Sequence, residues 1–385
     1  MRPGEEESRA LGVLAGGSGI GEAVRSCARP GAGIVELAGL LDRVRTIAEG
    51  AGPELARVLA DPRTTDVLLN SAQAWVDRGR GLEPIASPAE SEEEARALAV
   101  RLAAACGKRL DDASPIVDGS LPGGIRLHAV LPAPSASGTL ISLRTMRASG
   151  LGLADMERGG SVAPEIARVL RALVEARANV LVSGATGAGK TTLLAALLSL
   201  VPADERIVCI EEVPELAPVH PHVVSLVERR ANVQGRGAIP LSDLVRAAMR
   251  MRPDRLVLGE CRGPEVRDVL LALNTGHDGG WATIHANGAE DVPARLHALG
   301  ALAGMSEAAV AAQAVAALDA VVHMRRAPSR SGEDEGPGRW VAEVAILTRS
   351  GSELRCDLAI RASREGKRVH GPAWESLARR LGIDP

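Results

Sequence analysis

The segment that decides the fold is residues 184–191, Gly-Ala-Thr-Gly-Ala-Gly-Lys-Thr, which fills every fixed position of the pattern GxxxxGK[ST]. An apolar run at residues 179–183 precedes it and a helical pattern at residues 191–200 follows it, which is the strand–loop–helix setting that this motif requires. Glycines let backbone N–H groups turn around a phosphate chain, and the helix N-terminus adds positive potential. Lys190 can reach the β- and γ-phosphates of a nucleotide, and the Thr191 hydroxyl can ligate Mg²⁺. The segment therefore predicts a site for ATP and Mg²⁺.

Further apolar runs follow this loop along the chain, at residues 206–210, 255–259 and 281–285, with helical patterns between them. Alternating strands and helices of this kind are typical of a mostly parallel sheet with helices on both faces. Pro164 stands at the start of a helical pattern with one apolar face, ahead of the first strand. The sequence therefore predicts an α/β domain built around the phosphate-binding loop.

Acidic and histidine side chains stand where these predicted strands end. Glu260 directly follows the run at residues 255–259, Glu215 comes shortly after the run at residues 206–210, and His285 ends the third run. An isolated acidic cluster is usually a solvated loop, and a lone histidine is usually a loop residue. Because the carboxyl ends of parallel strands share one edge of a sheet, these residues can instead face the nucleotide, and we interpret them as catalytic candidates.

Composition shifts divide the chain into segments. A helical pattern begins at residue 34, residues 125–131 alternate like a strand, and glycines cluster between residues 150 and 160. Glycines at residues 16–21 resemble a dinucleotide fingerprint, but only a charged tail precedes them, so we interpret them as a linker. The expected organisation is a flexible N-terminal tail (1–33), a smaller α+β domain (34–146), a linker or hinge (147–163), the ATPase domain (164–325) and a C-terminal extension with a loop and a terminal strand pair (326–385).

Overall composition excludes several classes of protein. The 385 residues carry a formal net charge of −3 and contain no Phe or Tyr, which argues against nucleic acid as the main partner. The five cysteines form no CxxC pair and no zinc-ligand spacing. The N-terminus has neither the basic nor the apolar region of a signal peptide, and no apolar run is long enough to span a membrane. We therefore expect a cytoplasmic protein whose membrane association comes through a partner.

Three ordered segments, at residues 250–262, 274–279 and 283–287, resemble the type II/IV secretion ATPase superfamily, and most of all the TadA/CpaF branch that powers tight-adherence pili. The resemblance extends over residues 34–325. Within the N-terminal domain it is carried by residues 61–67, 114–118, 125–132 and 141–144. It implies a RecA-like P-loop motor domain behind a smaller α+β domain, ATP hydrolysis, and assembly into a homohexamer.

The resemblance also implies roles for individual residues. Glu260 matches the Walker B acid, which with Thr191 would hold Mg²⁺ directly or through water. Residues 211–215 match the Asp box, Glu215 its catalytic glutamate, and His285 the His box. The Walker A loop and the residue after it supply the nucleotide contacts: Gly184, Ala185, Thr186, Gly187, Ala188, Gly189, Lys190, Thr191 and Thr192.

Four arginines complete this set. Arg229 and Arg236 lie where the family places arginines near a neighbouring subunit's nucleotide, and Arg126 and Arg144 lie on the domain that in this family folds over the phosphates. The sequence departs from the family pattern at Glu212, where an aspartate is usual, and the match is weak after residue 323.

Together these features predict an ATP-hydrolysing motor of a type II/IV secretion or Tad-type pilus assembly machine. Its expected partners are copies of itself and inner-membrane platform proteins at the inner face of the cell membrane. One alternative is a conjugative DNA-transfer ATPase or nucleic-acid motor, against which the acidic balance and the scarcity of aromatic residues argue. Another is a scaffold that keeps the fold without hydrolysing ATP. The transported cargo, which could be pilin, another protein or DNA, stays open.

Overall fold

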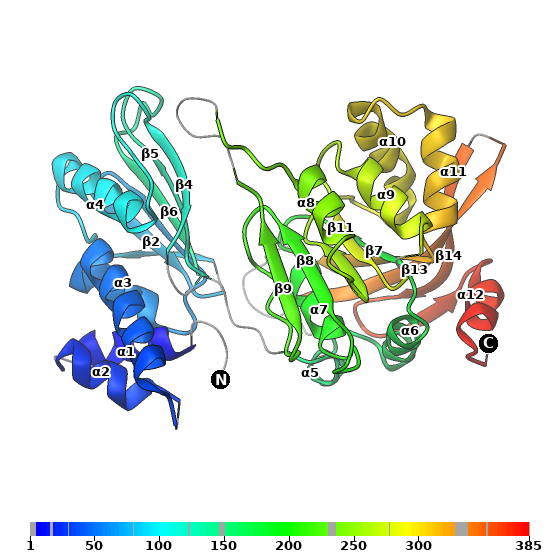
Figure 1. Ribbon diagram of the computed structural model, residues 1–385, viewed down its shortest axis with the longest axis horizontal. Helices are drawn as coiled ribbons and strands as arrows, with labels where there is room; N and C mark the ends of the chain where they lie inside the picture. Colours follow the sequence, from blue (N-terminus) through cyan, green and yellow to red (C-terminus); the bar gives the residue numbers. More distant parts are fainter. Residues whose placement is uncertain are drawn as a thin grey trace. The chain divides into compact units, whose positions relative to one another are not determined.

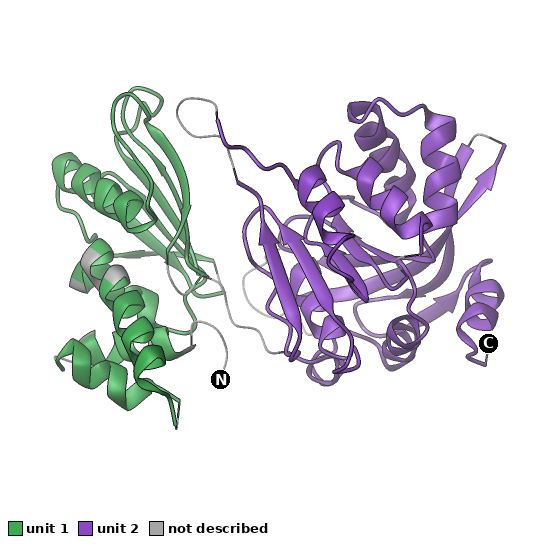
Figure 2. Ribbon diagram, viewed as in Figure 1, with its two compact units in different colours: residues 1–149 green, residues 150–385 purple. Residues whose placement is uncertain are grey.

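The computed structural model describes residues 5–15, 18–29, 31–79, 81–121, 124–145, 151–229, 236–276, 278–327, 338–351 and 353–384. The chain forms two compact units, unit 1 at residues 1–149 and unit 2 at residues 150–385 (Figures 1 and 2). Each unit has its own apolar core, as expected for segments that fold around separate sheets.

Unit 1 is an α+β unit. In its described part, six antiparallel strands follow the order β3-β2-β1-β6-β5-β4. The strands are β1 (Asp66–Asn70), β2 (Gln73–Asp77), β3 (Leu82–Ile85), β4 (Ile116–Ser120), β5 (Arg126–Val130) and β6 (Leu140–Arg144). Alternate residues such as Val67 and Leu143 are buried, so one face of the sheet packs into a core. That core also contains apolar side chains of α3 (Ile34–Ala60) and α4 (Glu92–Ala105).

The N-terminal segment differs from the flexible tail that we expected over residues 1–33. Two helices, α1 (Glu5–Ala15) and α2 (Ile20–Cys27), occupy it and bury Leu11 and Val24 in the core of unit 1. Each helix buries only one short apolar stripe, and the glycines between them mask the periodicity in the sequence. Of the glycine cluster interpreted as a linker, residues 16–17 lie outside the described residues.

Unit 2 is built on one mixed sheet. In its described part, nine strands follow the order β15-β14-β13-β12-β7-β11-β10-β8-β9. The strands from β12 to β9 in this order run parallel, and β13, β14 and β15 add antiparallel pairs. Their bounds are β7 (Val180–Gly184), β8 (Ile207–Glu211), β9 (Val223–Val227), β10 (Arg255–Leu258), β11 (Trp281–Ile284), β12 (Ala320–Arg326), β13 (Arg339–Ser350), β14 (Glu353–Ala362) and β15 (Arg368–His370). The predicted α/β class, preceded by an α+β domain, is confirmed.

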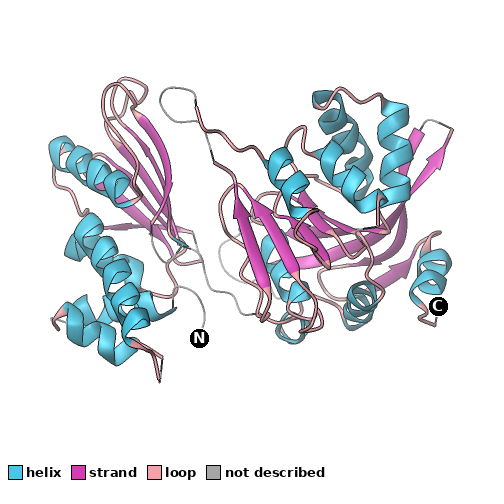
Figure 3. Cartoon of the chain, in the orientation of Figure 1, coloured by secondary structure: helices cyan, strands magenta, loops and turns pink. Residues whose placement is uncertain are grey.

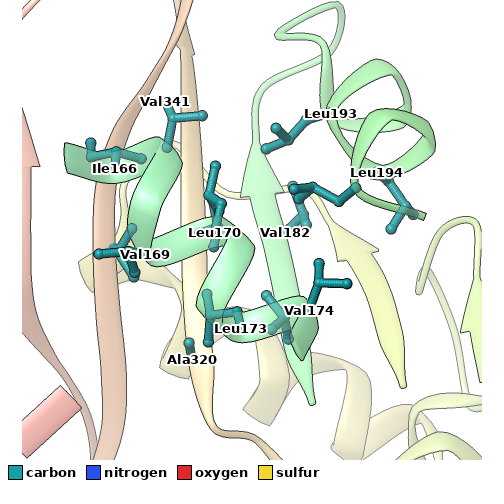
Figure 4. Packing of buried hydrophobic residues seen from close by; sticks show 14 of the residues in the cluster. Ile166, Val169, Leu170, Leu173, Val174, Val182, Leu193, Leu194, Ala320 and Val341 are labelled. Atoms are coloured by element: carbon teal, nitrogen blue, oxygen red, sulfur yellow. The ribbon is translucent and has the colours of Figure 1, made fainter. Parts of the chain in front are cut away.

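Helices cover both faces of this sheet (Figure 3). One face packs α5 (Leu153–Arg158), α6 (Pro164–Glu175), α7 (Lys190–Leu198) and α12 (Trp374–Leu381), and the other packs α8 (Leu241–Ala248), α9 (Val266–Asn274), α10 (Val292–Leu302) and α11 (Glu307–Ala317). Figure 4 shows apolar side chains of α6 gathered against Val182 of β7 and Val341 of β13. The central strands β7, β8, β10 and β11 are buried along their whole length, which is the pattern of parallel strands covered on both faces.

Two expected boundaries need correction. We expected residues 147–163 to be a linker, but α5 buries Leu153 and Met156 in the core of unit 2, and Val341 N–H donates to the Ser161 carbonyl at 2.9 Å. The part of the expected hinge at residues 147–150 lies outside the described residues. We also expected an extension after residue 325, but β13 and β14 continue the same sheet through β12. The Gly- and Pro-containing segments hid these links because they interrupt the apolar periodicity.

Within the described residues, no single helix has both the length and the apolar composition to cross a membrane. The segments 289–302 and 307–317 meet that criterion only as a pair, and a bend of 119° separates them.

Candidate nucleotide-binding site

The predicted phosphate-binding loop joins β7 to α7. Gly187 and Gly189 have φ angles of 72° and 97°, in the left-handed region that favours glycine. A Cβ on Gly184 would lie 2.6 Å from the carbonyl oxygen of Met324, which belongs to the neighbouring strand β12. The loop therefore needs glycine for two reasons, its backbone conformation and its close approach to β12.

Lys190 is folded back over this loop. Its Nζ donates to the carbonyls of Gly184 at 2.9 Å and Ala185 at 3.1 Å, and the residue is only 7% exposed. Burial lowers the pKa of Lys190, while the nearby charges of Glu260 and Glu215 act in the opposite direction. An anionic phosphate at the loop would supply the charged partner that two neutral carbonyls do not.

Two of the predicted site residues, His285 and Glu260, meet beside Lys190. His285 lies just past the end of β11 and places Nδ1 3.4 Å from Lys190 Nζ, while its Nε2 contacts Glu260 Oε1. Glu260 lies just past the end of β10, and its other oxygen accepts from Arg262 Nη2 at 2.6 Å. Burial, followed by the charge of Lys190, lowers the pKa of His285, so the imidazole is neutral near pH 7. The structure thus brings Lys190, His285 and Glu260 into one connected group.

The acidic segment after β8 contains three carboxylates in different settings. Glu211 is 4% exposed, and its Oε1 accepts the backbone N–H groups of Glu215 and Leu216, each at 2.9 Å. This residue therefore fixes the turn that carries Glu215. Glu212 instead forms an ion pair with Arg262 Nη1 at 3.4 Å. Sequence reasoning missed the buried role of Glu211, whose only signal is its position as the last residue of a fully buried strand.

Thr191 and Thr192 are half-buried in the first turn of α7. Among the described residues, no three His, Cys, Asp or Glu side chains come together as a metal cage. Mg²⁺ bound with a nucleotide takes most of its ligands from phosphates and water, so one hydroxyl and one carboxylate are enough from the protein. The Thr191 hydroxyl and the Glu260 carboxylate have the chemistry for those two positions.

A cavity of about 770 Å³ opens beside the loop. Its lining includes Ala185, Thr186, His285, Asn287, Asp291 and Arg295. Cavities of this volume hold small ligands of nucleotide size. The outer part of the loop and the predicted histidine therefore share one wall of a ligand-sized space.

A buried polar pair, also missed in the sequence, lies behind the loop. Ser183, which precedes the first loop glycine, places its Oγ 2.9 Å from Nδ1 of His323 on β12. Both residues are buried, and burial lowers the pKa of His323. This pair fixes the end of β7 to β12 directly beneath the loop.

The four predicted arginines belong to other elements than the loop, two in each unit. Arg126 and Arg144 are register partners on β5 and β6 of unit 1, and Arg144 Nε donates to Asp66 Oδ1 at 2.9 Å. Arg229 and Arg236 are exposed and follow β9, at the outer edge of the sheet in unit 2. Arg229 Nε donates to the Gly237 carbonyl at 2.5 Å, and residues 230–235 lie outside the described residues.

Comparisons with known proteins agree on one family. Residues 70–354 match the sequence profile named "Type II/IV secretion system protein". A putative conjugal transfer protein of Mycobacterium tuberculosis is 46% identical over 339 residues, which cover 86% of this chain and 94% of the relative. The conjugal transfer protein TrbB of Rhizobium radiobacter is 32% identical over 307 residues, 78% of this chain and 89% of the relative.

Solved structures resemble the chain in fold. The pilus retraction motor PilT with bound ADP aligns with a TM-score of 0.53 at 23% identity, over 78% of this chain and 84% of that chain. At that identity the likeness is one of fold alone.

Proposed function

Since the chain belongs to the type II/IV secretion system protein family, we propose that it is the ATP-hydrolysing motor of a secretion or pilus-assembly machine. The superfamily predicted from the sequence is thereby confirmed, and the TadA/CpaF branch stays a prediction. One observation carries the enzymatic part of the proposal. Lys190, His285 and Glu260 form a connected group at a glycine loop whose geometry suits a phosphate chain. A scaffold without catalytic function would not need to keep this group intact.

The proposed reaction is the Mg²⁺-dependent hydrolysis of ATP to ADP and phosphate. Backbone N–H groups of the loop and the N-terminus of α7 bind the phosphate chain. Lys190 exchanges its carbonyl partners for the β- and γ-phosphate oxygens. The buried ammonium thereby gains negatively charged partners in place of neutral ones. Thr191 and Glu260 would hold Mg²⁺, which would neutralise charge on the transferred phosphoryl group.

Glu215 is the proposed residue that orients and polarises the attacking water. Its turn is fixed by the two hydrogen bonds to Glu211, and its charge acts on Lys190 at the loop. His285 stands between Lys190 and Glu260, where a neutral imidazole can donate from one nitrogen and accept at the other. Its contact with Glu260 holds the ring beside Lys190.

The proposal for the machine and its cargo rests on the family, on the names of relatives and on the net charge. We propose export of pilin or another protein by a homohexameric ring that contacts inner-membrane platform proteins at the cytoplasmic face of the membrane. In such a ring, Arg229 or Arg236 would act as an arginine finger toward the neighbouring nucleotide. Conjugative DNA transfer is the second candidate, favoured by the names of two relatives. The net charge of −3 favours the first candidate, because a protein that grips DNA usually carries basic excess.

Phosphate release by the purified full chain tests this proposal. The wild type should hydrolyse ATP with Mg²⁺ and lose activity when EDTA removes the metal. Glu260→Gln should bind ATP and hydrolyse it at least tenfold more slowly, because it loses a metal-side carboxylate. Arg349→Gln, an exposed change at the far end of β13, is the control. Wild-type protein that binds ATP without hydrolysing it would favour the scaffold, and strong stimulation by DNA would favour the conjugative motor.

A further inference from the structure

Two arginines of the hairpin β12–β13 lie against the phosphate-binding loop. Arg326 ends β12 and Arg339 begins β13, and the two are register partners. Arg326 Nη1 lies 3.0 Å from the position that a Cβ on Gly187 would take, and Arg339 Cδ lies 3.5 Å from the same position on Gly189. The sequence resemblance is weak in this part of the chain, so it assigned neither residue a role.

These side chains are placed to receive an anion. Both are exposed, and Arg326 has no hydrogen-bond or ion-pair partner among the described residues. Arg325, its neighbour on β12, differs: successive side chains alternate across a strand, and Arg325 lies 3.6 Å from the buried Glu343. The guanidinium of Arg326 thus lies beside a loop that suits phosphate, and no carboxylate of the described residues pairs with it.

The strand order indicates which end of a bound nucleotide would lie near these arginines. The residues predicted to act on the γ-phosphate, His285, Glu260 and Glu215, follow β11, β10 and β8, all on one side of β7. The strands β12 and β13 lie on the opposite side of β7 (Figure 1). A nucleotide whose γ-phosphate faces the acids therefore directs its α-phosphate and nucleoside toward the hairpin.

We propose that Arg326, with Arg339 beside it, binds the α-phosphate at the nucleoside end of the nucleotide. This inference rests on the proposed function, because it assumes the same nucleotide in the same loop. A guanidinium presents two parallel N–H donors that match two phosphate oxygens. Because ATP and ADP share the α-phosphate, this contact adds affinity for both, and the hairpin that carries it makes the C-terminal part of the chain a wall of the site.

The test is the affinity of Arg326→Gln for ADP and for the slowly hydrolysed analogue β,γ-imido-ATP, measured by titration calorimetry. Removal of a charge-assisted hydrogen bond at an exposed arginine should weaken the binding of both ligands by about tenfold, to the same extent. Arg326→Lys should retain part of the affinity, since it keeps the positive charge but lacks the two parallel N–H donors of a guanidinium. Arg339→Gln should act in the same direction, and Arg349→Gln on the same strand should bind like the wild type.

Two results would overturn the inference. Unchanged affinity in both Arg326→Gln and Arg339→Gln would mean that the hairpin does not touch the nucleotide. A loss confined to the ATP analogue would mean that the arginines contact the γ-phosphate. In either case, nucleotide binding by the wild-type chain would leave the proposed function standing. A wild-type chain that binds neither nucleotide would overturn both the inference and the proposed function.

Discussion

Replacement of Glu211 by alanine tests whether this buried acid acts by holding the turn that carries Glu215, the proposed catalytic acid. The Glu211 carboxylate accepts two backbone hydrogen bonds at 2.9 Å, from Glu215 and Leu216, in a site where the residue is 4% exposed. Removal of the acceptor leaves each N–H group without a partner at a cost of about 1–3 kcal/mol, so two give an upper bound of about 6 kcal/mol. Water can reach part of the released turn because Glu215 is half-buried. We therefore expect Glu211→Ala to lose about 2–4 kcal/mol of unfolding free energy.

Catalysis should fall with the same change, because the turn that positions Glu215 is no longer fixed. We expect a drop in kcat of at least tenfold with ATP affinity within about threefold of wild type, since the loop itself is untouched. Glu211→Gln is the matched control, because its amide oxygen can still accept both N–H groups. The assays are urea unfolding followed by tryptophan fluorescence, which reports mainly on unit 2 through Trp281, Trp340 and Trp374, and steady-state phosphate release. Wild-type stability and turnover in Glu211→Ala would refute this account of the turn.

Four further predictions follow from the site and the predicted arginines. Glu215→Gln should bind ATP but hydrolyse it slowly, as a filter-binding and turnover comparison would show; failure to bind would reassign this acid to structure. Arg144→Ala should weaken ATP binding by about 1–3 kcal/mol more than ADP binding, and equal losses would mean that it does not contact the γ-phosphate. Arg229→Ala chains mixed with Lys190→Ala chains should recover some turnover in shared rings, whereas turnover by a monomer on a sizing column would exclude a finger in trans. Burial lowers the pKa of His323 below its value in the unfolded chain, near 6.5, so the unfolded chain binds the proton more tightly and protonation favours unfolding. The free energy of unfolding should therefore fall as the pH drops below about 6.5, and it should fall less in His323→Gln.

The parts of the fold that the sequence predicted are those where one local pattern dictates one structure. The central strands are buried on both faces and appear as short continuous apolar runs, and the loop before α7 needs glycine at fixed positions. The residues after these strands, Glu260 and His285, could be placed because parallel strands end at a common edge. These features were readable without any long-range contact.

The parts that the sequence did not predict depend on contacts distant along the chain. The helix α5 lies in a glycine-rich segment, and only its packing into unit 2 shows that Leu153 and Met156 belong to a core. The strand β12 reaches the loop through Met324, a contact across some 140 residues of sequence that no local pattern reveals. Glu211 and Glu212 are adjacent acids in the sequence, yet only the register of β8 beside β10 buries one and exposes the other to Arg262.

The central claim, that this loop binds and hydrolyses ATP, is tested most directly by phosphate release from Lys190→Ala beside the wild type, with Mg²⁺ and saturating ATP. The buried ammonium is the cation that the loop itself offers to the γ-phosphate, so we expect turnover to fall by at least a hundredfold while the circular dichroism spectrum stays unchanged. Turnover in the folded variant equal to that of the wild type would contradict the claim.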